Sequence, residues 1–153
     1  MRIRVADPSD AEAIVNLINA AFSIEKFFVD GDRITLDQVR SLFPKGEFLV
    51  ADGDAAPAGC VYVEQRGARA YFGLLSIDPA RQRTGLGSRL VAEAESWGRE
   101  RGCRFMDLRI VNLREELPAF YRRLGYVEDG TEPFPAETPT KMPCHFVNMS
   151  KQL

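Results

Sequence analysis

The chain has 153 residues, of which 45% are hydrophobic and 27% are charged, and its formal net charge at pH 7 is −2. This length and apolar content predict a single domain, residues 1–153, with enough apolar side chains to form a core. The nearly neutral charge, without a long basic run, argues against a nucleic-acid partner.

The N-terminal residues, the apolar runs and the cysteines indicate where the protein is located and whether it binds a metal. Residues 1–5 are too few and too charged for a signal peptide, and no segment has the apolar length of a membrane span. We therefore expect a cytoplasmic protein without a membrane partner. Cys60, Cys103 and Cys144 cannot all pair and form no C-x-x-C pattern, so we expect reduced, mostly buried thiols and no metal site.

The first third of the chain predicts a strand and two helices. Residues 2–6 alternate as in a strand, and the Asp-Pro pair at 7–8 supplies an N-cap followed by proline at the first helical position. A helix then runs to about Phe22, with one apolar stripe that packs on a sheet. Residues 35–38 have the pattern of a capping box, which begins a second helix that ends before Pro44.

The rest of the chain predicts strands around one further long helix. Strands are expected at residues 47–51, 58–65, 71–77, 104–111 and about 145–150. The helix begins near Leu86. Three antiparallel strands, a helix and a strand imply a parallel crossover, and hence an α/β hybrid with a mixed sheet. A proline-rich loop is expected at residues 131–143.

The most informative segment is residues 82–87, Gln-Arg-Thr-Gly-Leu-Gly, between a predicted strand and a predicted helix. Glycine has no Cβ, so a ligand can approach the main chain, and the first N–H groups of a helix have no partner within it. The helix dipole favours an anion there, such as a phosphate. The loop is not the Rossmann fingerprint G-x-G-x-x-G, because its third glycine would fall at position 90, which is Leu90. Three arginines are expected to add positive charge around the loop: Arg81, Arg83 and Arg89.

The loop matches the pattern Q/R-x-x-G-x-G/A, and residues 119–126, Ala-Phe-Tyr-Arg-Arg-Leu-Gly-Tyr, form a second motif. With these two motifs in this order, the chain resembles the GCN5-related N-acetyltransferase (GNAT) superfamily over nearly its whole length. The resemblance implies a mixed sheet of about six to seven strands flanked by about four helices and splayed between the fourth and fifth strands. It also implies acetyl-coenzyme A as co-substrate.

By this resemblance, the pantetheine arm lies in the splay, pairs with residues 75–77 as a pseudo-strand, and has its thioester oxygen held by a main-chain N–H. One such donor contributes about 3 kcal/mol to lowering a barrier. Many relatives have an asparagine that contacts the cofactor seven residues before the tyrosine, where this chain has Arg114. Asn112 lies two residues before that position, so a cofactor role for it requires a different strand end or a bulge. The expected cofactor-binding residues are Leu75, Ser76, Ile77, Gln82, Arg83, Thr84, Gly85, Leu86, Gly87, Ser88 and Asn112.

Tyr121 is the general acid that the resemblance implies. A phenol with a pKa near 10 can protonate a thiolate whose thiol has a pKa near 8.5, whereas the alternative is a ring that only packs on the cofactor. The strand at 71–77 has no carboxylate, although some relatives have glutamate there, so water is the expected proton acceptor. Five acidic residues are alternative bases: Glu64, Asp107, Glu25, Asp30 and Asp32.

Glu25, Asp30 and Asp32 fall between the first two helices, a segment that borders the acceptor site in similar proteins, so they are candidates to attract a cationic amine. His145, the single histidine, is a further candidate substrate residue. Cys144 and His145 cannot easily form a dyad because neighbours on a strand point to opposite faces. Direct attack of the amine in a ternary complex is therefore preferred.

The favoured function is transfer of an acetyl group from acetyl-coenzyme A to a primary amine of a small molecule. Acetylation of protein N-termini or lysines is the second interpretation. A catalytically silent acyl-coenzyme A sensor, and a module that binds another nucleotide such as ATP or NAD, are alternatives of a different class. A homodimer is an expectation of the resemblance alone.

Overall fold

The computed structural model describes residues 1–153 and contains one seven-stranded sheet in the order β1-β2-β3-β4-β5-β7-β6. The parallel pair β4–β5 is the exception among otherwise antiparallel neighbours. The strands are β1 (Ile3–Val5), β2 (Glu47–Ala51), β3 (Gly59–Arg66), β4 (Arg69–Ile77), β5 (Phe105–Val111), β6 (Val127–Pro133) and β7 (His145–Gln152). The α-helices are α1 (Ala11–Ala21), α2 (Leu36–Leu42), α3 (Leu86–Glu100) and α4 (Leu117–Arg123). The predicted mixed sheet with about four helices is confirmed.

The helix starts follow the capping signals of the sequence. Asp7 caps a 3-10 turn, η1 (Pro8–Asp10), and α1 begins only after it. The helix ends near Phe22 as predicted, but the chain continues as a second 3-10 segment, η2 (Phe22–Phe27). At α2, the Thr35 hydroxyl accepts a hydrogen bond from the main-chain N–H of Gln38, whose side chain accepts one in return. The predicted capping box is confirmed.

β6 occupies the start of the segment that we expected to be a loop from residue 131. All its residues are exposed and they show no apolar alternation, which left no periodic signal in the sequence. The ladder shifts register between Glu128 and Thr131, around Gly130, whose φ is 104°. β6 pairs only with β7, so Pro133 lies in an edge strand, where its missing N–H costs no ladder bond.

Apolar cores lie on both faces of the sheet. α3 and α4 cover one face, where Leu90 and Met106 are fully buried. α1 and α2 cover the other face, where Ile14 and Phe48 are fully buried, and α1 lies against β3 and β4. The outer half of that second face, formed by β5 and β7, remains partly exposed. We call this part of the sheet the open face.

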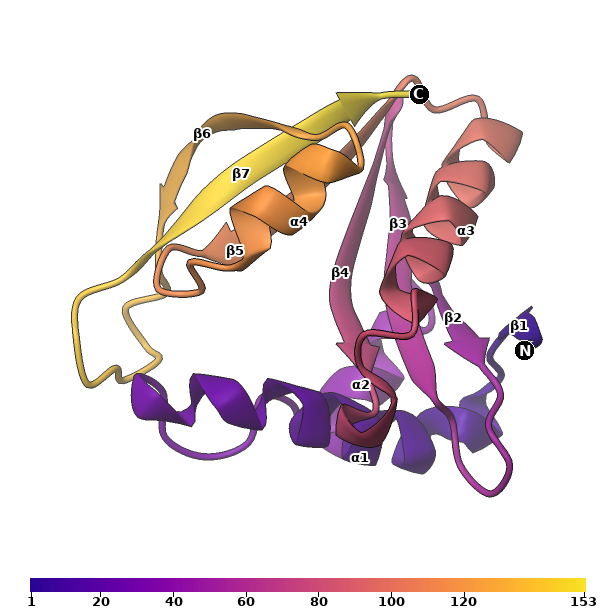
Figure 1. Ribbon diagram of the computed structural model, residues 1–153, viewed down its shortest axis with the longest axis horizontal. Coiled ribbons are helices and arrows are strands. Elements are labelled where there is room, and N and C mark those ends of the chain that lie inside the picture. Colours follow the sequence, from indigo (N-terminus) through magenta and orange to yellow (C-terminus); the bar gives the residue numbers. More distant parts are fainter.

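β4 and β5 pair only over their first three residues, ending at Tyr71 and Asp107. Beyond them the two strands separate into a widening gap, with α3 on one side and α4 on the other (Figure 1). A bulge at Leu74, whose φ is 56°, shifts the register of β4 against β3. The predicted splay between the fourth and fifth strands is confirmed.

Candidate active site

The loop at residues 82–87 delivers the N-terminus of α3 to the open end of the gap (Figure 1). Gly85 is the N-cap residue with a φ of 81°, and no side chain caps the helix. Arg83 also has a positive φ, 65°, while the Thr84 hydroxyl donates a hydrogen bond to the Arg81 carbonyl over 2.7 Å. The first main-chain N–H groups of α3, at Leu86, Gly87 and Ser88, are therefore left without a capping side chain.

Gly87 has room for a side chain. A Cβ there would meet the Phe120 ring at 3.5 Å and Ile77 at 4.0 Å, which are ordinary contacts. Alanine is better than glycine inside a helix by about 0.5–1 kcal/mol, so packing within the protein does not explain this glycine. Close approach of a ligand to the main chain does, and the uncapped helix end fits an anionic group such as a pyrophosphate.

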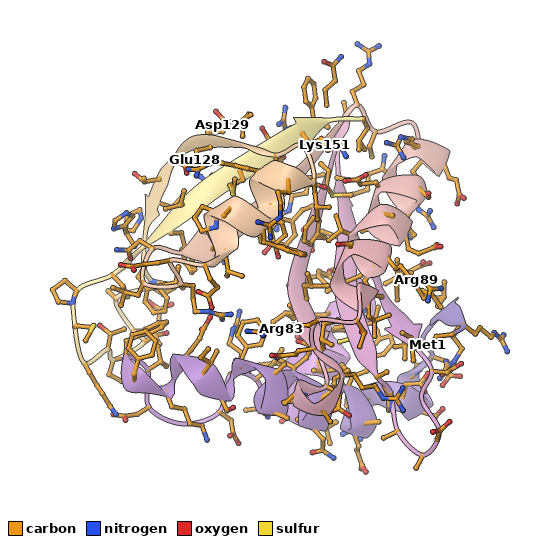
Figure 2. All side chains as sticks on the ribbon, viewed as in Figure 1. Met1, Arg83, Arg89, Glu128, Asp129 and Lys151 are labelled. Carbon is orange, nitrogen blue, oxygen red and sulfur yellow. The ribbon has the colours of Figure 1, made fainter.

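The arginines near this loop have different surroundings. Figure 2 shows Arg83 on the gap side of α3 and Arg89 on its other side, near Met1. Arg89 donates a hydrogen bond to the Met1 carbonyl over 2.8 Å, and the closest carboxylate oxygen of Asp54 lies 3.7 Å from Arg81. The Arg89 side chain is therefore engaged with the start of the chain instead of the loop.

Main-chain groups at the end of β4 face the gap. The Asp78 N–H donates to the Ala58 carbonyl, and strand alternation then directs the main-chain groups of Leu75 and Ile77 away from β3, where β5 no longer pairs. Ser76 differs, because its main chain faces β3 and its buried hydroxyl donates to the Leu74 carbonyl. Of the three predicted cofactor residues on β4, only Leu75 and Ile77 present free main-chain groups to the gap.

Tyr121 lies on α4 with 5% of its surface exposed, and its ring is 6.0 Å from those of Phe72 and Tyr126. The hydroxyl has no hydrogen-bond partner in the protein, yet it is not among the fully buried polar atoms, so it is accessible. Burial raises the pKa of Tyr121 above its usual value, and the nearby Arg114 guanidinium opposes that rise. The phenol therefore stays protonated at neutral pH and can donate a proton.

Asn112 joins the end of β5 to the start of β7. Its side-chain oxygen accepts a hydrogen bond from the His145 N–H over 2.8 Å, and its own N–H donates to the His145 carbonyl over 2.9 Å. The side-chain oxygen is thus committed to the fold, and the amide nitrogen is the group left for a ligand. His145 itself is exposed.

The three acidic residues between α1 and α2 do not form one cluster. Glu25 pairs with Arg114 at 2.8 Å, Asp30 lies 3.2 Å from Lys141, and Asp32 is exposed without an ion pair. Burial raises the pKa of Glu25, and the hydrogen bond from Arg114 opposes this. Sequence reasoning gave Arg114 no role, although its place seven residues before Tyr121 marked it as a departure from the pattern of similar proteins.

Two of the alternative bases are also engaged. Glu64 accepts hydrogen bonds from the Tyr62 hydroxyl and from Arg66, and Asp107 accepts two from Arg69, both at 2.7 Å.

No three His, Cys, Asp or Glu side chains are grouped so that they could hold a metal ion. No helix has both the length and the apolar content that crossing a membrane requires.

Comparisons with known proteins agree with this geometry. Residues 44–128 match the acetyltransferase (GNAT) domain. Glucosamine 6-phosphate N-acetyltransferase 1 of Oryza sativa subsp. japonica is 28% identical over 86% of this chain and 84% of that protein. A Streptococcus mutans UA159 protein (TM-score 0.82, 20% identity, 99% of both chains) and a ribosomal-protein-alanine N-acetyltransferase of Brucella melitensis (0.81, 18%, 100% of both) share the fold. The family match spans more than half of the chain, which therefore belongs to the GNAT acetyltransferase family.

Proposed function

We propose that this protein transfers an acetyl group from acetyl-coenzyme A to a primary amine of a small molecule. One observation carries the proposal. The uncapped N-terminus of α3, with its glycine loop, and the unpaired edge of β4 both border the gap between β4 and β5. Membership of the GNAT family supports it. The small-molecule acceptor is supported by the rice relative, whose name places the acetylated amine on an amino sugar phosphate.

The cofactor would lie along residues that the gap brings together. The loop from Gln82 to Ser88 supplies main-chain N–H groups for the pyrophosphate, and Leu75 and Ile77 supply main-chain partners for the pantetheine arm. Ser76 shapes this edge through its buried side chain, and Asn112 offers its amide nitrogen at the end of β5. When bound, acetyl-coenzyme A supplies an acetyl group activated as a thioester.

The chain's own groups can perform the remaining tasks. A main-chain N–H of Leu75 or Ile77 donates to the carbonyl oxygen on which negative charge develops, and one such donor lowers a barrier by about 3 kcal/mol. The Tyr121 hydroxyl donates a proton to the departing sulfur. Four of the five alternative bases are paired with cations, and the fifth, Asp32, is an exposed loop residue, so water takes the proton from the amine.

Direct attack of the amine fits the cysteines better than a covalent enzyme intermediate. Cys60 and Cys103 are buried, and burial raises the pKa of the Cys60 thiol to about 12. A thiol with so high a pKa is a poor nucleophile at neutral pH because the thiolate is the reactive form. Cys144 is half-buried next to the exposed His145, but neighbouring residues on an extended chain point to opposite sides, so the two do not easily form a dyad.

A thiol-release assay with acetyl-coenzyme A and a panel of amines and peptides tests the proposal. We expect turnover of small primary amines, and a decrease in kcat of about 100-fold or more for Tyr121→Phe with unchanged coenzyme A binding. Tyr62→Phe is the matched control and should leave kcat unchanged, since it removes a phenol from the opposite face of the sheet to Tyr121. Coenzyme A binding without turnover of any acceptor favours the silent sensor, and turnover of peptides alone favours protein acetylation.

A further inference from the structure

Gly73 on β4 leaves a space that the Tyr71 side chain fills. A Cβ on Gly73 would lie 2.6 Å from the Tyr71 hydroxyl oxygen and 3.1 Å from two of its ring carbons, and the first distance is shorter than any contact that a Cβ makes. Residues two apart on a strand point to the same face, so the Tyr71 ring lies along β4 over Gly73. The Arg66 guanidinium carbon stacks on this ring, 4.0 Å from its centre. The position of the Tyr71 hydroxyl therefore explains the missing Cβ of Gly73.

This position brings the Tyr71 hydroxyl to the unpaired edge of β4. Tyr71 is the last residue of β4 that pairs with β5, opposite Asp107, and Gly73 lies two residues further along the gap. The Tyr71 ring packs against the core beneath α1 and α2, whereas Tyr121 belongs to the core beneath α3 and α4. Two phenols therefore border the gap from opposite faces of the sheet.

The Tyr71 hydroxyl is free to bind water. It makes no hydrogen bond within the protein and is not among the fully buried polar atoms, so solvent reaches it. Tyr71 also lines a cavity of about 260 Å³ on the open face, which has room for several waters. A polar lining favours water over an apolar group. Besides Tyr71 and Asn148, the polar lining has three cations and three anions: Arg66, Arg69, Arg109, Asp107, Asp129 and Glu132.

The spacing along β4 matches one bridging water. A strand rises about 3.3 Å per residue, so the hydroxyl over Gly73 lies about 7 Å from Leu75 and about 14 Å from Ile77. Two successive hydrogen bonds through one water span about 5–6 Å, which reaches an amine that attacks a thioester held at the main-chain N–H of Leu75. Because α3 and α4 cover the other face, the amine approaches from the face on which this hydroxyl lies (Figure 1).

We propose that the Tyr71 hydroxyl holds the water that takes the proton from the attacking amine. This inference rests on the proposed function, which assigns that proton to water. The phenol oxygen accepts a hydrogen bond from the water and leaves a lone pair of the water directed at the amine N–H. Tyr71 is thus a positioning residue on the opposite face from the acid, Tyr121.

The protons balance in this arrangement. As the N–C bond forms and the C–S bond breaks, the water receives the proton that the nitrogen loses, and Tyr121 supplies the proton that the sulfur gains. The cavity on the open face leads the first proton to bulk solvent, from which Tyr121 regains its own. No carboxylate has to leave its ion pair.

A crystal structure of the complex with coenzyme A tests the water directly. We expect an ordered water about 2.6–3.0 Å from the Tyr71 hydroxyl oxygen, on the side of the gap. The same complex of Tyr71→Phe, which keeps the ring over Gly73, should lack it. No water at the hydroxyl of the wild type, or the same water in both proteins, would overturn the inference. This readout needs no turnover, so failure to acetylate any amine would count against the proposed function alone.

The kinetics of the same variant separate positioning from structure. Tyr71→Phe should lower kcat about tenfold or more, while its melting temperature, its coenzyme A affinity and the KM of the amine stay near those of the wild type. Tyr62→Phe is the matched control, because this neighbouring phenol packs in the core on the same face but donates its hydrogen bond to Glu64. It should leave kcat unchanged. Wild-type kcat in Tyr71→Phe, or an equal loss in Tyr62→Phe, would contradict the assignment.

Discussion

The Arg114 guanidinium donates a hydrogen bond of 2.8 Å to the carboxylate of Glu25, a residue 89 positions earlier in the chain. Only 14% and 12% of these two side chains are exposed, respectively. The pair joins the segment after β5 to η2, which follows α1, and so connects the two halves of the molecule on either side of the gap. It also places a cation close enough to Tyr121 to affect the pKa of its phenol.

Arg114→Gln should lower the free energy of unfolding by about 1–3 kcal/mol, because it leaves the Glu25 carboxylate buried without its partner. Urea unfolding at pH 7 measures the change. Arg123→Gln, which alters an exposed arginine without an ion pair, should change stability by less than about 0.5 kcal/mol. If the two variants were equally stable, the pair would contribute nothing to linking the halves.

The two loop glycines should respond differently to alanine. Gly85→Ala should cost about 1–2 kcal/mol of stability because its φ of 81° is unfavourable for a residue with a Cβ. Gly87→Ala should leave stability unchanged or slightly higher, since its Cβ meets only ordinary contacts, but it should weaken coenzyme A binding by crowding the helix N-terminus. Melting temperature and calorimetric titration separate the two effects. Full coenzyme A affinity in Gly87→Ala would remove the argument that a ligand explains this glycine.

Lys151 on β7 should anchor that strand to α3 (Figure 2). Its ammonium lies 3.1 Å from both oxygens of Glu95, which is 6% exposed and also accepts a hydrogen bond of 2.8 Å from the Tyr126 hydroxyl. Lys151→Met keeps the apolar stem but leaves the carboxylate with one fewer donor, so we expect a loss of about 1–3 kcal/mol in urea unfolding. Stability equal to that of the wild type would show that Tyr126, water and Arg99, which lies 3.9 Å away, suffice for Glu95.

Stability should decrease in strong alkali. Burial raises the pKa values of Tyr62, Tyr121 and Tyr126 above the ordinary value near 10. The unfolded chain therefore loses these protons at lower pH than the folded chain, and the free energy of unfolding falls as pH rises above about 10. The loss should be about 1 kcal/mol for each tyrosine by pH 11. Urea unfolding at pH 9 and 11 measures it, and Tyr62→Phe should reduce the slope.

Local signals in the sequence predicted much of the fold. The capping box at Thr35 depends on residues three apart, and the helix stripes and inner strands depend on short apolar periods. β6 could not be placed to its end because an exposed edge strand with Gly130 and Pro133 has no such period. The splay came from the resemblance, since nothing local in β4 shows where its partner departs.

The site was predictable in its main-chain part and less so in its side chains. The glycine loop and the Tyr121 motif are contiguous in sequence. The Arg114–Glu25 pair joins residues 89 positions apart, so only the fold brings them together. For the same reason, the three acidic residues before α2 looked like one cluster in the sequence, although Glu25 and Asp30 each pair with a distant cation.

Whether the gap holds acetyl-coenzyme A can be measured by thermal shift. The protein is melted with acetyl-coenzyme A, coenzyme A, ATP and NAD in parallel, since a ligand that binds only the folded state must raise the melting temperature. We predict clear stabilisation by both coenzyme A forms and little by ATP or NAD. No shift with saturating acetyl-coenzyme A, or a larger shift with ATP or NAD, would show that the gap is not an acetyl-coenzyme A site.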